Sequence, residues 1–118
     1  MFSKIIDPAL IAECERRTNS TGSPIGEETE ARIAAAYYAC RTVFETELDM
    51  LVGIYVFDDS EPDAFVLETS RGNALAISTE LSKARFMELK ICLLVSLSDA
   101  VLYGPEKELD VCSLRETD

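Results

Sequence analysis

Acidic side chains are the residues of this sequence whose type and spacing indicate chemistry. Between Thr42 and Ser70 the chain has eight of them and no lysine or arginine. These acids are Glu45, Glu47, Asp49, Asp58, Asp59, Glu61, Asp63 and Glu68. Clustered carboxylates attract either a divalent cation or the basic surface of another protein. This segment is therefore a candidate site for a divalent cation or for a basic protein.

The densest part of the segment, Asp58 to Asp63, does not have the spacing of a calcium-binding loop. Such a loop of the EF-hand kind places Asp or Asn at alternate positions, Gly at its centre and Glu at its twelfth position. Here the central Gly is missing and Pro62 stands where a ligand is required. We therefore expect no metal and no cofactor, and a solvated turn in their place.

The second interpretation is a contact surface for a basic protein partner. The expected contact residues are the neighbouring acids together with one aromatic side chain that a surface can expose: Glu45, Glu47, Asp49, Tyr55, Asp58, Asp59, Glu61 and Asp63. Complementary charge steers such a partner toward the surface. The competing interpretation is a polar helix flank around an ordinary turn, and the two carry equal weight.

Catalytic and metal-binding motifs are absent from the sequence. The chain has no histidine, which removes the commonest general base and the commonest zinc ligand. It also has no P-loop, no Rossmann glycine pattern and no zinc-type cysteine pair. The four cysteines, Cys14, Cys40, Cys92 and Cys112, are widely spaced and predict free thiols. We expect a protein that is not an enzyme, with catalysis by carboxylates alone as the least favoured class.

The overall charge narrows the partners further. Twenty-two Asp and Glu against eleven Lys and Arg give a net charge of −11. This field disfavours direct binding to nucleic acid or to an anionic membrane. No apolar run approaches the ~20 residues of a membrane helix, and the N-terminus lacks the apolar region of a signal peptide. We therefore expect a cytoplasmic protein.

Three helices are expected to frame the acidic segment. The first begins at Pro8 behind the capping residue Asp7. A second begins at Ser23 or shortly after it and continues to about Leu48. Its apolar residues recur at steps of three and four: Ile33, Tyr37, Cys40, Phe44 and Leu48.

A third, C-terminal helix is capped by Ser78 or Thr79 and stops at Gly104. One of its faces carries Phe86, Leu89, Leu93, Leu97 and Ala100. Its other faces are apolar as well, which predicts a central helix that is buried from several sides.

The segment between these helices is open to two interpretations. Val52 to Phe57 and Ala64 to Thr69 have the residues of buried strands, but apolar periodicity and a capping signal at Ser60 also fit helix. A hairpin turn at Gly72-Asn73 with a two-residue loop leaves neither face apolar. A four-residue loop, which pairs Val66 with Ile77, does better. Helix is preferred here.

The expected fold is a single domain over residues 1–118, an all-α bundle of four or five helices with a frayed C-terminal end. The alternative is α+β, with a small antiparallel sheet from Val52 to Ile77 between the long helices. The expected function is that of a non-enzymatic acidic protein that inhibits, neutralises or regulates a basic protein partner, as an immunity protein or a mobile-element inhibitor does. The alternative is a homo-oligomeric helical scaffold or small-ligand sensor, in which apolar helices pair in a homodimer.

Overall fold

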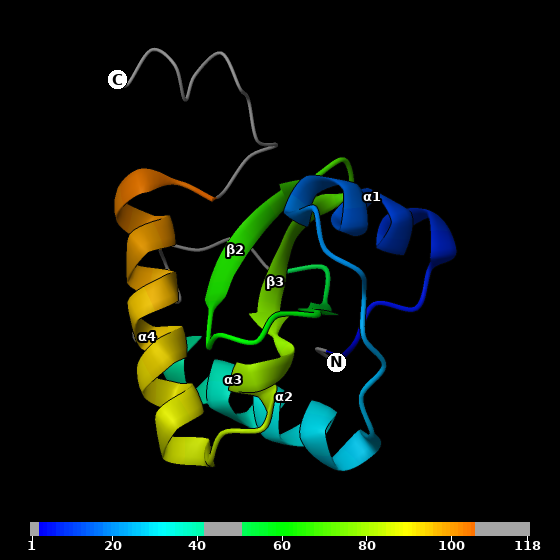
Figure 1. The fold of residues 1–118 in the computed structure, drawn as a ribbon. Helices are drawn as coiled ribbons and strands as arrows, with labels where there is room; N and C mark the ends of the chain where they lie inside the picture. Colours follow the sequence, from blue (N-terminus) through cyan, green and yellow to red (C-terminus); the bar gives the residue numbers. More distant parts are fainter. Residues whose placement is uncertain (1–2, 42–50, 106–118) are drawn as a thin grey trace.

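The structure is a computed structural model that describes residues 3–41 and 51–105, and in these residues four helices surround a three-stranded sheet. The elements follow one another as α1 (Pro8–Thr18), α2 (Glu27–Arg41), β1 (Ile54–Phe57), β2 (Ala64–Thr69), β3 (Gly72–Ser78), α3 (Thr79–Ser82) and α4 (Phe86–Tyr103). The sheet lies between α1 on one side and α2 with α4 on the other (Figure 1). The fold class is therefore α+β.

The sheet is mixed, with the strand order β1-β3-β2. The central strand β3 runs parallel to β1 and antiparallel to β2. The chain therefore leaves β1, passes to the far edge of the sheet for β2, and returns between the two as β3. The connection from β1 to β2 consequently emerges at the end of the sheet where β3 finishes.

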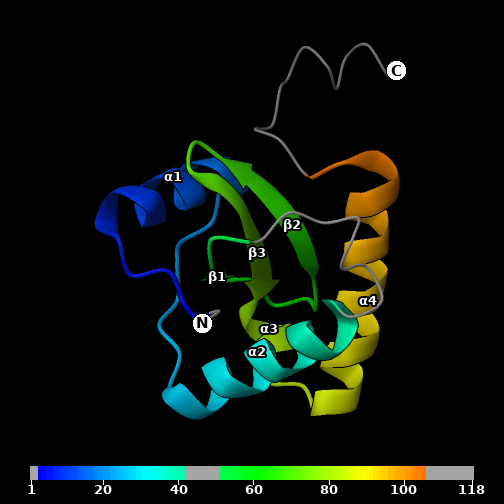
Figure 2. The same ribbon diagram turned by 180° about the vertical axis from the view of Figure 1, so that it is seen from behind.

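Both faces of the sheet are buried because successive side chains of a strand point to opposite sides. One face packs against α2 and α4 and carries Ile54, Val56, Val66, Leu75 and Ile77. The other face packs against α1 and carries Tyr55, Phe57, Leu67 and Ala76. Figure 2 shows α2 and α4 beside each other on the first of these faces.

The expectation of an all-α bundle is wrong, because the segment that it assigned to helix forms the three strands. The α+β alternative is closer, although it proposed an antiparallel sheet and the sheet is mixed. Strands that are covered on both faces carry apolar residues in continuous runs, and such runs resemble a buried helix. Because helices cover both faces of the sheet, the strands lack the alternation of apolar and polar residues that would have identified them.

The hairpin between β2 and β3 turns at Ser70 and Arg71, and not at Gly72-Asn73. Val66 pairs with Leu75 rather than with Ile77. Within the turn the Thr69 hydroxyl accepts from the Arg71 amide at 3.2 Å, and from α1 the Glu13 carboxylate accepts hydrogen bonds from the Ser70 amide at 2.8 Å and from the Ser70 hydroxyl at 2.5 Å. The contact joins residues 57 positions apart, so no local pattern indicates it.

The ends of α1 agree with the expectation. The Asp7 side chain accepts a hydrogen bond from the Ala9 amide at 2.9 Å, and Pro8 is the first helical residue. The second helix begins at Glu27, a few residues later than expected. Its expected continuation to Leu48 lies outside the described residues from position 42 onward.

The C-terminal helical region differs from the expectation in two ways. Ser78 caps the separate one-turn helix α3, and α4 starts only at Phe86. Moreover, α4 is not central: Leu89, Leu93 and Leu97 are fully buried, but Ile91 and Val95 are each 58% exposed. The helix therefore packs through one face. Its end agrees with the expectation, since Gly104 takes φ +84°, which favours glycine.

Among the helices of the described residues, none combines the length and the hydropathy that crossing a membrane requires.

The N-terminal segment lies along the outer edge of β1. The Ile5 amide donates to the Ile54 carbonyl at 2.8 Å, and the Ile54 amide donates to the Ser3 carbonyl at 3.0 Å. Gly53 permits this approach, because a Cβ there would lie 2.8 Å from the Ser3 oxygen.

Candidate functional site: the acidic loop

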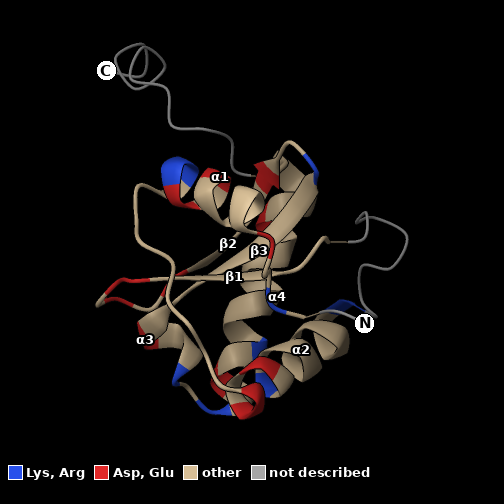
Figure 3. Ribbon diagram, turned by 90° about the vertical axis from the view of Figure 1, so that its right-hand side faces the viewer, with Lys and Arg blue, Asp and Glu red and all other residues tan. Residues whose placement is uncertain are grey.

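The acidic loop, residues 58–63, joins β1 to β2 at the end of the sheet where β3 finishes. Asp58, Glu61 and Asp63 are exposed, and Asp59 is half-buried. In the ribbon coloured by charge, the loop projects next to α3 as a segment rich in acids (Figure 3). Four carboxylates are thus presented within six residues of chain.

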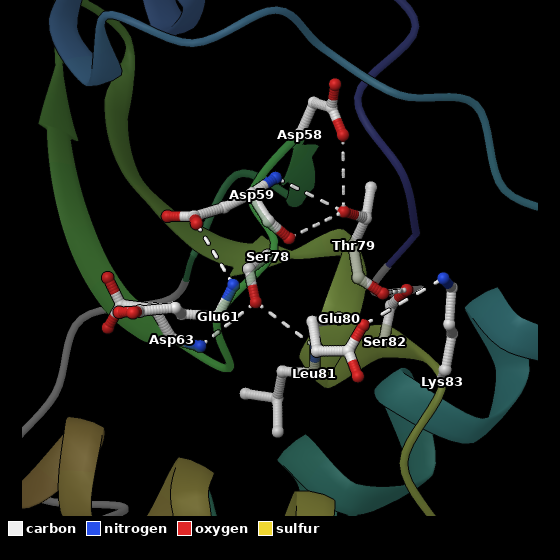
Figure 4. Close-up of polar contacts among 10 residues, drawn as sticks. All are labelled: Asp58, Asp59, Glu61, Asp63, Ser78, Thr79, Glu80, Leu81, Ser82 and Lys83. Carbon is white, nitrogen blue, oxygen red and sulfur yellow. Dashed lines mark hydrogen bonds and ion pairs between the residues drawn. The ribbon is translucent and has the colours of Figure 1, made fainter.

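Thr79, the first residue of α3, anchors the first half of the loop. Its hydroxyl accepts a hydrogen bond from the Asp59 amide at 3.2 Å and donates to the Asp59 carbonyl at 2.9 Å. The Asp59 carboxylate in turn accepts from the Glu61 amide at 3.1 Å. The two bonds to the Asp59 backbone fix the path of the chain, and the Thr79 hydroxyl also lies 3.5 Å from the Asp58 carboxylate (Figure 4).

Ser78, the last residue of β3, anchors the second half. Its hydroxyl oxygen accepts from the Asp63 amide at 2.9 Å, while its own amide donates to the Asp63 carbonyl at 2.9 Å. The same hydroxyl accepts from the Leu81 amide at 3.1 Å and so caps α3. One buried side chain therefore holds both the loop and the helix beside it.

Sequence reasoning assigned Ser78 and Thr79 only a capping role. Their link to the acidic loop depends on the strand order, which places the end of β3 against the chain that follows β1. A pair of hydroxyl residues directly after an apolar run is the one local signal that these positions carry. That signal indicates a turn or a cap and does not say which distant segment is held.

The electrostatic setting of the loop is unbalanced. Within the described residues, none of its four carboxylates belongs to an ion pair. The ion pairs found there join Arg17 to Glu13, Arg71 to Asp7 and Lys83 to Glu80. The loop therefore presents its negative charge without a cationic partner among the described residues.

Figure 4 shows the Asp58 and Asp59 carboxylates directed away from each other, and those of Glu61 and Asp63 on a third side of the loop. In the part of the chain that the structure describes, no group of three or more acids or cysteines is placed to hold a metal ion. The geometry of the loop suits contact with a second surface better than enclosure of an ion.

Of the other acids between Thr42 and Ser70, the structure describes Glu68 alone. Glu45, Glu47 and Asp49 lie outside the described residues. Glu68 is exposed on β2, five residues beyond Asp63 and therefore roughly 17 Å away along an extended strand. In the described residues, the clustered acids of the segment from Thr42 to Ser70 are therefore those of the loop, and Glu68 lies apart from them.

Tyr55 is not a surface contact. Its side chain is 3% exposed, and its hydroxyl donates to the Ser20 carbonyl at 3.1 Å. Burial raises the pKa of Tyr55 to about 12. The expectation of an exposed aromatic residue does not agree with this position, because alternation along β1 turns the ring toward α1.

A cleft of about 340 Å³ lies at the outer edge of β1, between the N-terminal segment and residues 22–25. Its walls are mostly aliphatic, with Ile5, Ile25 and Val56 among them. The Lys4 ammonium donates a hydrogen bond to the Ile25 carbonyl at 3.2 Å. The cleft has the volume of a small-ligand site but offers few polar groups to orient a ligand.

The cysteines of the described residues, Cys14, Cys40 and Cys92, are free thiols. Cys14 and Cys40 are buried, and burial raises the pKa of Cys14 to about 11. A thiol with a raised pKa is a poor nucleophile at neutral pH. Cys112 lies outside the described residues.

Fold and site together define a class: an α+β protein with both sheet faces covered by helices and a pinned acidic loop at one end of the sheet. Comparison with protein families, with curated proteins and with solved structures finds no match to this chain. The function is therefore argued from the geometry and charge of the chain alone.

Proposed function

We propose that this protein is a non-enzymatic acidic binding protein that inhibits, neutralises or regulates a basic protein partner, in the manner of an immunity protein or a mobile-element inhibitor. The observation that carries the proposal is the acidic loop: four carboxylates that form no ion pair with any described residue, on a backbone held by Ser78 and Thr79.

Two physical effects favour such a loop as a contact surface. A net charge of −11 steers a basic partner toward the protein, and local carboxylates set the orientation of the encounter. A pinned backbone has already lost the conformational freedom that binding would otherwise remove. The loop therefore combines long-range attraction with low ordering cost.

The test uses two variants with the same net charge. The loop variant carries Asp58→Asn, Asp59→Asn, Glu61→Gln and Asp63→Asn. The control variant carries Glu27→Gln, Glu68→Gln, Glu88→Gln and Asp99→Asn, all at exposed positions. Each variant has four fewer negative charges, so the net charge changes from −11 to −7 in both.

The first measurement is affinity capture from native cell extract, with mass spectrometry of the bound proteins. We expect the wild type and the control variant to capture a basic protein, and the loop variant to lose it. Surface plasmon resonance with that partner should show a slower on-rate for the loop variant and for the wild type at high salt. Equal on-rates for the two variants would mean that the loop is only a solvated turn.

A further inference from the structure

The outward face of α4 is an apolar surface that no other described helix or strand covers. Helix α4 packs against α2 and β2 through its inner face. On the opposite side, residues at steps of three and four form the α4 stripe: Met87, Ile91, Leu94, Val95, Ser98 and Leu102. The exposed fractions are 61% for Met87, 58% for both Ile91 and Val95, and 70% for Leu102.

The α4 stripe carries no charge in a protein that is otherwise densely charged. The three charged residues of α4, Glu88, Lys90 and Asp99, lie to the sides of the stripe. Its single polar side chain is Ser98, whose hydroxyl donates to the Leu94 carbonyl at 2.8 Å. An exposed apolar surface bordered by polar residues is typical of an interaction site.

We infer that the α4 stripe is the contact surface between two copies of this chain. The first argument is area: the exposed parts of the stripe amount to roughly 500 Å² per copy, so pairing two stripes buries about 1,000 Å², the lower limit for a specific interface.

The second argument is charge. A contact between two chains of net charge −11 is repulsive wherever acids meet, and the stripe is an uncharged face on which two copies can approach. A two-fold contact repeats the same residues on both sides, and an uncharged apolar stripe is complementary to itself. The same net charge opposes an anionic membrane as the occupant.

This inference goes beyond the proposed function and uses none of the loop carboxylates, although Pro62 of the acidic loop and Ile91 of the α4 stripe line one cleft. Dimerisation through the α4 stripe and binding of a basic partner to the loop should also respond to salt in opposite directions. Salt screens the repulsion between two acidic copies and strengthens the apolar contact, so the dimer should tighten as salt rises. Binding of a basic partner to the loop should weaken under the same change.

The test is sedimentation equilibrium of the full chain at low and high salt. The stripe variant carries Ile91→Gln and Val95→Gln. The matched control carries Ile6→Gln and Val52→Gln, which replace the same residue types at positions 76% and 42% exposed elsewhere on the surface. Glutamine favours helix at least as well as isoleucine or valine, so α4 should remain intact, and far-UV circular dichroism checks this.

A wild-type dimer that tightens with salt is expected, together with a dissociation constant raised about tenfold or more in the stripe variant and unchanged in the control. A monomer up to about 1 mM at both salt concentrations would overturn the inference. So would a dimer that the control weakens as much as the stripe variant does.

The two proposals fail separately in these experiments. The stripe variant should still capture the basic partner, because its loop is unchanged. The loop variant described above should dimerise at least as tightly as the wild type, because it carries four fewer negative charges. A loop variant that loses the dimer would place the contact at the loop and contradict the assignment to α4.

Discussion

Glu13 is a buried residue of α1 whose side chain contacts the β2–β3 turn, 57 positions further along the chain. It is 8% exposed, and its carboxylate accepts from the Ser70 amide, the Ser70 hydroxyl and, at 3.0 Å, the Arg17 guanidinium. The Ser70 hydroxyl is the largest cause of a lowered pKa at Glu13, and burial opposes it. The ionised form therefore holds the β2–β3 turn against α1.

The stability contributed by Glu13 should depend on pH. A carboxyl whose folded-state pKa lies below its ordinary value of 4.5 stabilises the fold above that value. The contribution is lost as the pH falls through the folded-state pKa. Glu13→Gln is expected to lower the free energy of unfolding by about 1–3 kcal/mol at pH 7, and the difference from wild type should shrink below pH 4.5.

Urea denaturation at a series of pH values measures this difference. Glu88→Gln, at an exposed position, serves as the control and should change the free energy of unfolding by less than ~0.5 kcal/mol. A destabilisation by Glu13→Gln that stays constant from neutral to acidic pH would show that the shape of the side chain matters and its charge does not.

At the scale of the elements, α4 has two faces with different roles. Leu93 is 0% exposed and packs with α2 and the sheet, whereas the next residue, Leu94, is 37% exposed. Hydrogen bonds also join α4 to its neighbours: the Ser96 hydroxyl donates to the Ala64 carbonyl at 2.8 Å, and the Cys40 thiol donates to the Lys90 carbonyl of α4 at 3.2 Å. The position of α4 thus depends on its inner face.

Truncation of these adjacent leucines should separate the two faces. Leu93→Ala is expected to lower the free energy of unfolding by about 2–5 kcal/mol, because it leaves a cavity in the core. Leu94→Ala should cost less than ~1 kcal/mol, since alanine favours helix and the side chain is partly in solvent. Urea denaturation in dilute protein tests this; equal losses would indicate that α4 is buried on both sides.

At the scale of the whole molecule, charge and apolar surface are carried by neighbouring elements, since Pro62 of the acidic loop and Ile91 of the α4 stripe line one cleft. The acidic loop lies at the end of β3, whereas the α4 stripe faces outward from the layer of α2 and α4. A net charge of −11 on 118 residues makes self-repulsion a property of the entire chain. Stability against unfolding should therefore respond to total charge as well as to particular contacts.

Sodium chloride is expected to raise the free energy of unfolding of the wild type, because it screens this repulsion. The loop variant and its charge-matched control should both show a smaller rise, and the two rises should agree. Urea denaturation at about 0.05 and 0.5 M salt provides the comparison. A reduced rise in the loop variant alone would show that the repulsion is local to the loop.

Local signals in the sequence determined the features that depend on a few adjacent residues. Asp7 and Pro8 start α1, Gly104 ends α4, and the acids from Asp58 to Asp63 form a turn, all as expected. Net charge likewise follows from composition. A cap, a stop or a turn involves neighbours in the chain, so its energy is present in the sequence before any tertiary contact forms.

Tertiary structure decided whether the central segment is strand or helix, where its hairpin turns and which groups hold the acidic loop. Two helical layers cover the sheet, and this removes the period-two pattern by which a strand is identified. Glu13 then contacts the turn at Ser70, and Ser78 and Thr79 reach the loop only because β3 lies between β1 and β2. These contacts join residues 15 to 57 positions apart, and their energy exists only once the strands have paired.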